Sequence, residues 1–221
     1  MTSPISTPPA DAPAHGHPVV RLKPKAEARA IRHGFPWVYA DELVTDRRTQ
    51  SLAPGALAVL EDGERRPLGL VTVNNNSKII ARMLDRDPMA QIDQSWFAAK
   101  IARALSLRER LYDEPFYRLI HAEADGLPGV VIDRFGDTAV VQPNAAWAET
   151  HLEALVDALV AVTGVANVVK NATGRCADPA GTRAQAWKPI QYLTCAENRA
   201  PHQASSRHQC LDKETIHHPQ S

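Results

Sequence analysis

The stretch RLIHAEADGLPGVVIDRFGDTAVVQPNAAWAE (118–149) carries the clearest structural signals in this chain of 221 residues. Residues 130–135 and 138–142 are rich in β-branched and aliphatic side chains, and Gly136-Asp137 between them predicts a β-hairpin. Pro128-Gly129 fits the two central positions of a type II turn, because the second position needs a positive φ. The stretch therefore predicts three extended segments in succession, the first being residues 118–123.

Helical patterns flank these strands on both sides. Asp93 can cap a helix that runs to about Leu111. A second helix is expected over about residues 148–162, ending at Gly164, and a final strand over 165–170. The order helix, three strands, helix, strand predicts an α+β domain over residues 91–175.

Residues 18–90 show a different pattern, with short strands around one small helix. Pro24 suits the first turn of a helix over 25–32. Turn residues separate the later strands, so these are expected to form hairpins. The expected strands are 19–23, 56–61, 67–74 and 78–84. This region predicts a compact β-barrel or β-roll, and the fold class is mixed α/β (α+β) with two folded parts.

The two ends of the chain look unlike these parts. Residues 1–17 are rich in Pro, Ala, Ser and Thr, and they are expected to form a disordered arm. Residues 176–221 have few, widely spaced aliphatic residues, so we expect a disordered tail. This tail holds Cys176, Cys195 and Cys210 near four histidines, which leaves a zinc site open as a minor alternative. Because no two of these cysteines are closely spaced, no metal ligand is assigned.

Composition excludes some classes of protein. The chain is 44% hydrophobic, which argues against complete disorder, and its formal net charge of zero gives no general case for binding nucleic acid. No stretch approaches the ~18 apolar residues of a membrane helix, and the N-terminus lacks a secretory signal. We expect a soluble cytoplasmic protein with no membrane or DNA partner.

Charge is nevertheless distributed unevenly. Residues 18–90 hold 12 basic and 9 acidic side chains, whereas 91–175 hold 8 and 11. Lys25, Arg29 and Arg32 would share one face of the expected helix and could neutralise phosphates, while nearby aromatic rings could stack on bases. The candidate RNA-binding residues are Lys23, Lys25, Arg29, Arg32, His33 and Trp37. A solvated helix face beside an aromatic core segment remains the alternative, and the residues alone favour it.

No catalytic or cofactor-binding residue emerges from the motifs. Glu123, Asp125, Asp133 and Asp137 cluster around turns, where such residues are common for structural reasons. No two glycines are separated by one residue, so a G-x-G phosphate or nucleotide turn is absent from the sequence.

Three stretches of the sequence are together similar to one family. RLKPKAEARAIRHGFPWVYADEL (21–43), PLGLVTVNNNSKIIARML (67–84) and the stretch 118–149 resemble the PUA-containing, S-adenosylmethionine-dependent 23S ribosomal RNA (cytosine-C5) methyltransferases. The resemblance implies that residues 18–90 are a PUA domain that recognises ribosomal RNA and that 91–175 are the family's central domain. It thus favours the RNA-binding interpretation of the basic residues over the alternative.

The resemblance ends after VVKNATGR (168–175). Members of the family continue with a doubly wound methyltransferase domain, which needs on the order of 200 residues. We therefore expect this domain to be missing, through a frameshift, a fused reading frame or a mispredicted gene end. On this view the chain binds ribosomal RNA, binds no S-adenosylmethionine and is inactive on its own. A non-enzymatic RNA- or protein-binding adaptor is the alternative.

Overall fold

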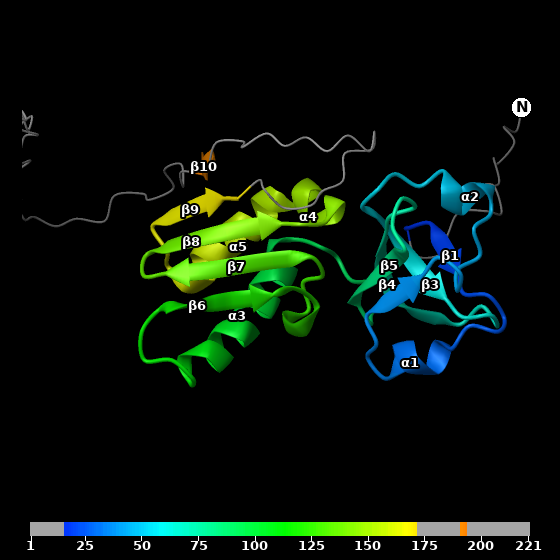
Figure 1. Cartoon of the computed structure of the whole chain (residues 1–221), viewed down its shortest axis with the longest axis horizontal. Helices are drawn as coiled ribbons and strands as arrows, with labels where there is room; N and C mark the ends of the chain where they lie inside the picture. Colours follow the sequence, from blue (N-terminus) through cyan, green and yellow to red (C-terminus); the bar gives the residue numbers. More distant parts are fainter. Residues whose placement is uncertain (1–15, 172–190, 194–221) are drawn as a thin grey trace, which may run out of the picture.

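The computed structural model describes residues 16–171 and 191–193. These residues form two five-stranded sheets, each with its own helices (Figure 1). The mixed α/β fold expected from the sequence is confirmed. The expected arm and most of the expected tail, including the three cysteines, lie outside the described residues.

The first sheet has the strand order β1-β3-β4-β5-β2. Its strands are β1 (Val19–Arg21), β2 (Trp37–Tyr39), β3 (Ala56–Glu61), β4 (Pro67–Val73) and β5 (Ile79–Asp85). The two edges of the sheet meet beyond β1 and β2, where Leu22 and Leu43 form an antiparallel bridge. Backbone hydrogen bonds from Lys23 to Glu42 (2.8 Å) and from Val44 to Arg21 (2.8 Å) extend this bridge. The sheet therefore closes on itself as a small barrel, which removes its exposed edges.

The barrel encloses its own hydrophobic core. Its members come from all five strands and the connecting segments, and they include Val20, Val38, Leu60, Val71 and Ile80. Two short helices lie outside the strands: α1 (Ala28–Arg32) and α2 (Arg47–Gln50). Asp46 caps α2, since its carboxylate accepts a hydrogen bond from the Thr49 amide (2.8 Å).

The second sheet has the order β10-β9-β8-β7-β6. Its strands are β6 (Phe116–His121), β7 (Val130–Phe135), β8 (Thr138–Pro143), β9 (Asn167–Lys170) and β10 (Gln191–Leu193). Helices α3 (Gln94–Glu109) and α5 (Leu152–Thr163) pack together against this sheet (Figure 1). Short helices η1 (Ala122–Asp125) and α4 (Ala146–Thr150) follow β6 and β8. A second core, centred on Phe97, Ile132 and Trp147, lies between sheet and helices.

The turn at Pro128-Gly129 has the predicted geometry. Val130 donates a backbone hydrogen bond to Leu127 (3.0 Å), and Gly129 has a φ of +73°. A β-carbon at Gly129 would also lie 2.8 Å from the β-carbon of Ala145. Trp147 donates its indole N–H to the Pro128 carbonyl (2.9 Å), which ties the turn to the second core.

Two helix predictions need correction. The helix expected over 25–32 is only the five residues of α1, because Pro24 and Lys25 lie in a turn that Ala26 closes by donating to the Lys23 carbonyl (2.9 Å). Proline suits the second position of such a turn as well as it suits a helix start. The helix expected over 148–162 is divided at His151 into α4 and α5. The short elements α2, η1 and β10 were not predicted.

In the part of the chain that the structure describes, no helix is long and apolar enough to cross a membrane. Within the same residues, no group of three or more His, Cys, Asp and Glu side chains could hold a metal ion.

Candidate nucleic-acid interface

Five of the six candidate RNA-binding residues are exposed, all but Trp37. Lys23 and Lys25 lie in the turn before α1, and Arg29 lies on α1. His33 follows the helix, and its Nδ1 is 2.8 Å from the Arg29 carbonyl. The structure corrects the reason for grouping these residues, because Lys25 precedes α1 and cannot share a helix face with Arg29 and Arg32.

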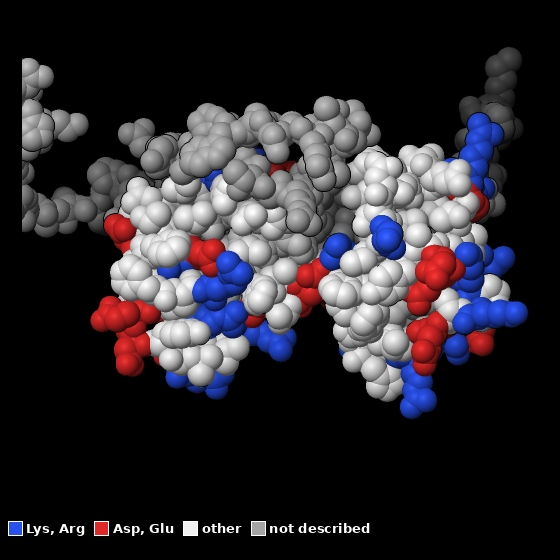
Figure 2. Space-filling model, viewed as in Figure 1, with Lys and Arg blue, Asp and Glu red and all other residues white. Residues whose placement is uncertain are grey.

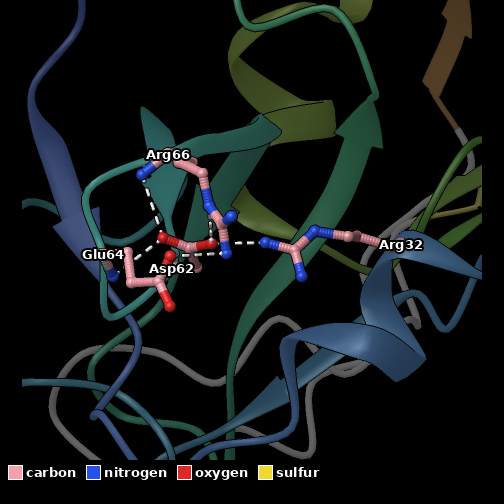
Figure 3. A network of polar contacts seen from close by, with 4 residues as sticks. All are labelled: Arg32, Asp62, Glu64 and Arg66. Carbon is pink, nitrogen blue, oxygen red and sulfur yellow. Dashed lines mark hydrogen bonds and ion pairs between the residues drawn. The ribbon is translucent and has the colours of Figure 1, made fainter.

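Arg32 belongs to a network around the carboxylate of Asp62 (Figure 3). The Asp62 side chain is only 4% exposed, and it accepts hydrogen bonds from the guanidinium groups of Arg32 and Arg66. It also accepts from the backbone amides of Glu64 and Arg66, each at 2.9 Å. Arg66 in turn pairs with the Glu64 carboxylate at 2.9 Å. A single buried carboxylate thus joins α1 to the turn between β3 and β4.

The network changes the pKa of Asp62. Burial by itself would raise the pKa of this carboxyl, since it disfavours the charged form. The hydrogen bonds from Arg66 and the Glu64 amide, together with the positive charge of Arg66, outweigh burial and lower the pKa to about 2. Asp62 therefore stays ionised at neutral pH and holds two arginines by charge-assisted hydrogen bonds.

The β3–β4 turn lies against the turn before α1. A β-carbon at Gly63 would be 3.0 Å from the α-carbon of Pro24. Segments distant in sequence therefore meet here, and we call their exposed cations the basic face. Its members are Lys23, Lys25, Arg29, Arg32, Arg65 and Arg66. Figure 2 shows several Lys and Arg side chains on the barrel half of the molecule, with acidic side chains among them.

Arg65, Arg66 and the part played by Asp62 were not predicted from the sequence. The hairpin expected from residues 56–61 and 67–74 is formed by β3 and β4, and Asp62-Gly63 lies in its turn. The additional signal was the spacing of Asp62 and Arg66, four residues apart around the turn. This spacing does not indicate that the Asp62 carboxylate is buried.

Trp37 lies away from the basic face. Its indole N–H donates to Oε1 of Glu123 on η1 (2.9 Å), and its ring makes an edge-on contact with Phe35 at a centroid distance of 5.9 Å. Trp37 is half-buried where the barrel meets the second sheet. Trp37 therefore lies at the contact between the two parts, and a contact of Trp37 with RNA stays a prediction.

Glu123 also accepts a hydrogen bond from the guanidinium of Arg82 on β5. Burial would raise the pKa of Glu123, but the hydrogen bond from Trp37 and the pairing with Arg82 lower it overall. Glu123 was grouped in the sequence with turn carboxylates. Its structural role is to join η1 to two strands of the barrel.

The described residues do not fit the methyl donor S-adenosylmethionine. A class I site needs adjacent parallel strands and a glycine-rich turn at their ends. Here the second sheet contains one parallel pair, β8 and β9, among the described strands. Gly126, Gly136 and Gly164 lie at a helix end or in a hairpin turn. No catalytic or donor-binding residue is therefore assigned.

A known protein family matches the part of the chain that forms the barrel. Residues 20–86 match the family model of the PUA-like domain. This part of the chain is PUA-like. All six residues of the basic face lie within the residues that match the PUA-like domain.

The chain is also similar to larger proteins. It is 34% identical over 159 residues to a ribosomal RNA large subunit methyltransferase from Deinococcus radiodurans, covering 68% of this chain and 38% of the relative. Against ribosomal RNA large subunit methyltransferase I from Cronobacter sakazakii it is 35% identical over 141 residues, which are 62% of this chain and 35% of that protein. The chain thus spans little more than a third of the length of either relative.

Solved structures share the fold. A Streptococcus mutans protein described as a SAM-dependent methyltransferase superposes with a TM-score of 0.59 at 14% identity, covering 70% of this chain and 40% of that one. A second structure, described as a methyltransferase complexed with SAH, superposes with a TM-score of 0.57, also at 14% identity, over 70% of this chain and 39% of that one. These similarities establish the mixed α/β architecture beyond the PUA-like domain.

Proposed function

We propose that this chain binds ribosomal RNA through the basic face of its PUA-like domain. We propose further that it is the RNA-binding and central portion of an S-adenosylmethionine-dependent methyltransferase acting on cytosine C5, and that it transfers no methyl group by itself. Its partner would be ribosomal RNA rather than DNA or a membrane, and we place it in the cytoplasm with that partner.

The observation that carries the proposal is the assembly of the basic face. Cations from two segments distant in sequence, residues 23–32 and 65–66, meet at one end of the barrel, and the buried Asp62 fixes two of them. Such a surface neutralises phosphates whatever the base sequence, with lysine as a point charge and arginine as a planar fork. The PUA-like match and the ribosomal RNA methyltransferase relatives support RNA as the polyanion.

RNA binding is tested with paired charge variants of the full chain. Lys25→Ala/Arg29→Ala removes two cations of the basic face, and Arg103→Ala/Arg110→Ala removes two exposed arginines around α3 as a matched control. We expect the first variant to bind a ribosomal RNA fragment at least about tenfold more weakly, since each lost phosphate contact lowers affinity. Equal affinities for both variants would contradict the proposed interface.

Methyl transfer is tested separately. The purified chain is incubated with labelled S-adenosylmethionine and unmodified ribosomal RNA, and incorporation is counted. We expect none, because the described residues hold no site that fits the donor. Clear incorporation would contradict this part of the proposal while leaving RNA binding intact.

A protein-binding adaptor is the second candidate function. It is favoured by exposed apolar side chains at the edge of the second sheet: Leu111, Tyr112, Phe116 and Phe135 are each more than half exposed, and Phe116 and Phe135 pair across β6 and β7. Specific capture of one protein in the absence of RNA, lost in Phe116→Ser/Phe135→Ser, would support this function.

A further inference from the structure

One row of side chains on the barrel faces the second sheet. Leu57, Thr72, Arg82 and Trp37 are successive cross-strand partners on β3, β4, β5 and β2. Directly opposed residues in antiparallel strands project from the same face of a sheet. Leu57 packs against the second core, while Arg82 and Trp37 bond to Glu123. Thr72, in the middle of the row, contacts a space between the two parts.

That space is a cleft of about 650 Å³. The turn at residues 74–78 between β4 and β5 forms one wall, and residues 144–150 leading through α4 form the other. Thr72 and Arg82 lie between them. The volume falls within the range of ~300–1,000 Å³ typical of ligand sites.

Several polar side chains that line the cleft have no hydrogen-bond partner among the described residues. Thr72 is 5% exposed, and its hydroxyl has no hydrogen-bond partner among the described residues. The side chains of Asn76, Ser77 and Lys78 in the turn also have no hydrogen-bond partner among the described residues. Thr72 lines the cleft, so its hydroxyl is available to donate or accept a hydrogen bond with a ligand there.

The opposite wall adds an amide and no free negative charge. Asn144 uses its Oδ1 to accept a hydrogen bond from Gln142 (3.1 Å), which leaves the side-chain amide N–H groups available. Glu149 is neutralised by Lys170, with Nζ 2.6 Å from its carboxylate. The cleft therefore offers hydroxyl and amide groups together with the cation of Lys78, and its one carboxylate is paired.

We propose that this cleft binds a single unpaired nucleotide of the RNA held by the basic face. Asn76, Asn144 and Thr72 would hydrogen-bond to the edge of the base, because amides and hydroxyls can match both donors and acceptors there. Lys78 would pair with the adjoining phosphate. The inference rests on the proposed RNA-binding function, but it concerns a separate surface: the cleft is lined by the turn after β4, whereas the basic face includes the turn before β4.

Crosslinking locates the nucleotide directly. The full chain is irradiated with a single-stranded ribosomal RNA oligonucleotide containing 4-thiouridine, and the crosslinked peptides are identified by mass spectrometry. We expect crosslinks within residues 74–82 and 144–150. Crosslinks confined to residues 21–33 and 62–66 would overturn the cleft site while supporting the basic face. Failure of the chain to bind any RNA would overturn the proposed function and the cleft with it.

Two variants measure the contribution of the cleft. Asn76→Ala/Lys78→Ala should weaken binding of the single-stranded oligonucleotide about tenfold and leave binding of a fully paired duplex unchanged. Thr72→Val replaces only the hydroxyl, so we expect an affinity loss of about threefold with unchanged unfolding by urea. Lys25→Ala/Arg29→Ala should weaken both RNAs equally. Wild-type affinity in both cleft variants would contradict the proposal.

A free nucleotide is the alternative ligand for the cleft, since it carries the same base and phosphate groups as RNA. We expect cytidine monophosphate to shift no amide resonance of the cleft at concentrations where the oligonucleotide shifts several. Saturable shifts with the mononucleotide alone, without crosslinks to RNA, would overturn the assignment to RNA.

Discussion

The carboxylates of Asp62 and Glu123 each accept hydrogen bonds from arginine, but their partners lie at different distances along the sequence. Asp62 binds Arg66 four residues away and Arg32 thirty residues away, all within the PUA-like domain. Glu123 binds Arg82 and Trp37, which lie 41 and 86 residues away across the contact between the two sheets. Asp62 is almost completely buried, and Glu123 is partly exposed. The first organises a surface, and the second fixes how two folded parts meet.

The two carboxylates therefore stabilise different parts of the molecule. Loss of the Asp62 network should disorder the basic face while the two sheets remain in contact. Loss of the Glu123 contacts should loosen the junction, and with it the cleft, while the basic face stays intact. Variants of the two regions should therefore separate binding of phosphates from binding in the cleft.

The largest effect on stability is expected for Gly55→Ala. Gly55 has a φ of +89°, and a β-carbon there would lie 2.7 Å from the backbone nitrogen of Trp147. The two parts would have to move apart, so we expect a loss of about 3 kcal/mol in the free energy of unfolding, measured in urea. The control Gly164→Ala has a φ of +67° but an empty surrounding, and should cost only about 1 kcal/mol. Similar losses in the two variants would mean that the close contact at Gly55 adds nothing.

Asp62→Asn should have the next largest effect. The substitution leaves Arg32 and Arg66 beside a neutral amide, so we expect a loss of about 2 kcal/mol in the free energy of unfolding. RNA affinity should fall as well, because both arginines lose their fixed position. Glu64→Gln is the matched control, since Glu64 is exposed and its backbone amide still donates to residue 62. A variant with wild-type stability and RNA affinity would show that Asp62 does not organise this surface.

Glu123→Gln should have a smaller effect on stability, about 1 kcal/mol, because its partners remain partly accessible to water. The clearer readout is the indole N–H of Trp37, which should exchange with solvent faster when its acceptor is weakened. Glu109→Gln, at an exposed position on α3, provides the control. If the Trp37 indole exchanged at the same rate in both variants, Glu123 would not be joining the two parts.

The last prediction concerns the effect of acid on stability. Asp62 has a pKa of about 2 in the folded chain, against 3.8 when unperturbed. A lowered folded-state pKa contributes stability that is fully present above pH 3.8 and is lost as the pH falls toward 2. The stability difference between wild type and Asp62→Asn should therefore shrink over this interval, as measured by urea unfolding at each pH. A difference that stayed constant down to pH 2 would contradict the lowered pKa.

The sequence was most informative where structure depends on neighbouring residues. The Pro128-Gly129 turn and the hairpin of β7 and β8 were predictable because φ preferences and side-chain alternation act locally. Residues 25–32 show the limit, because Pro24 is compatible with both a turn and a helix start. In the structure these residues form a turn, which the hydrogen bond from the Ala26 amide to the Lys23 carbonyl closes.

The site depended on contacts that the sequence does not encode locally. The sequence predicted Lys23, Lys25, Arg29 and Arg32 as cations near one another, but not the buried Asp62 that fixes Arg32. Trp37 was interpreted as a stacking surface because its acceptor, Glu123, is 86 residues away. The cleft could not be predicted, because its walls come from two parts of the chain that are distant in sequence, residues 72–82 and 144–150.

A salt titration of the full chain with a ribosomal RNA fragment shows whether the basic face binds RNA through phosphates. If about four phosphates are neutralised, the logarithm of the binding constant should fall linearly with the logarithm of salt concentration, with a slope of about −3. Affinity would then drop about 50-fold between about 50 and 200 mM salt. Binding that is absent at low salt, or that stays constant across the titration, would contradict the account.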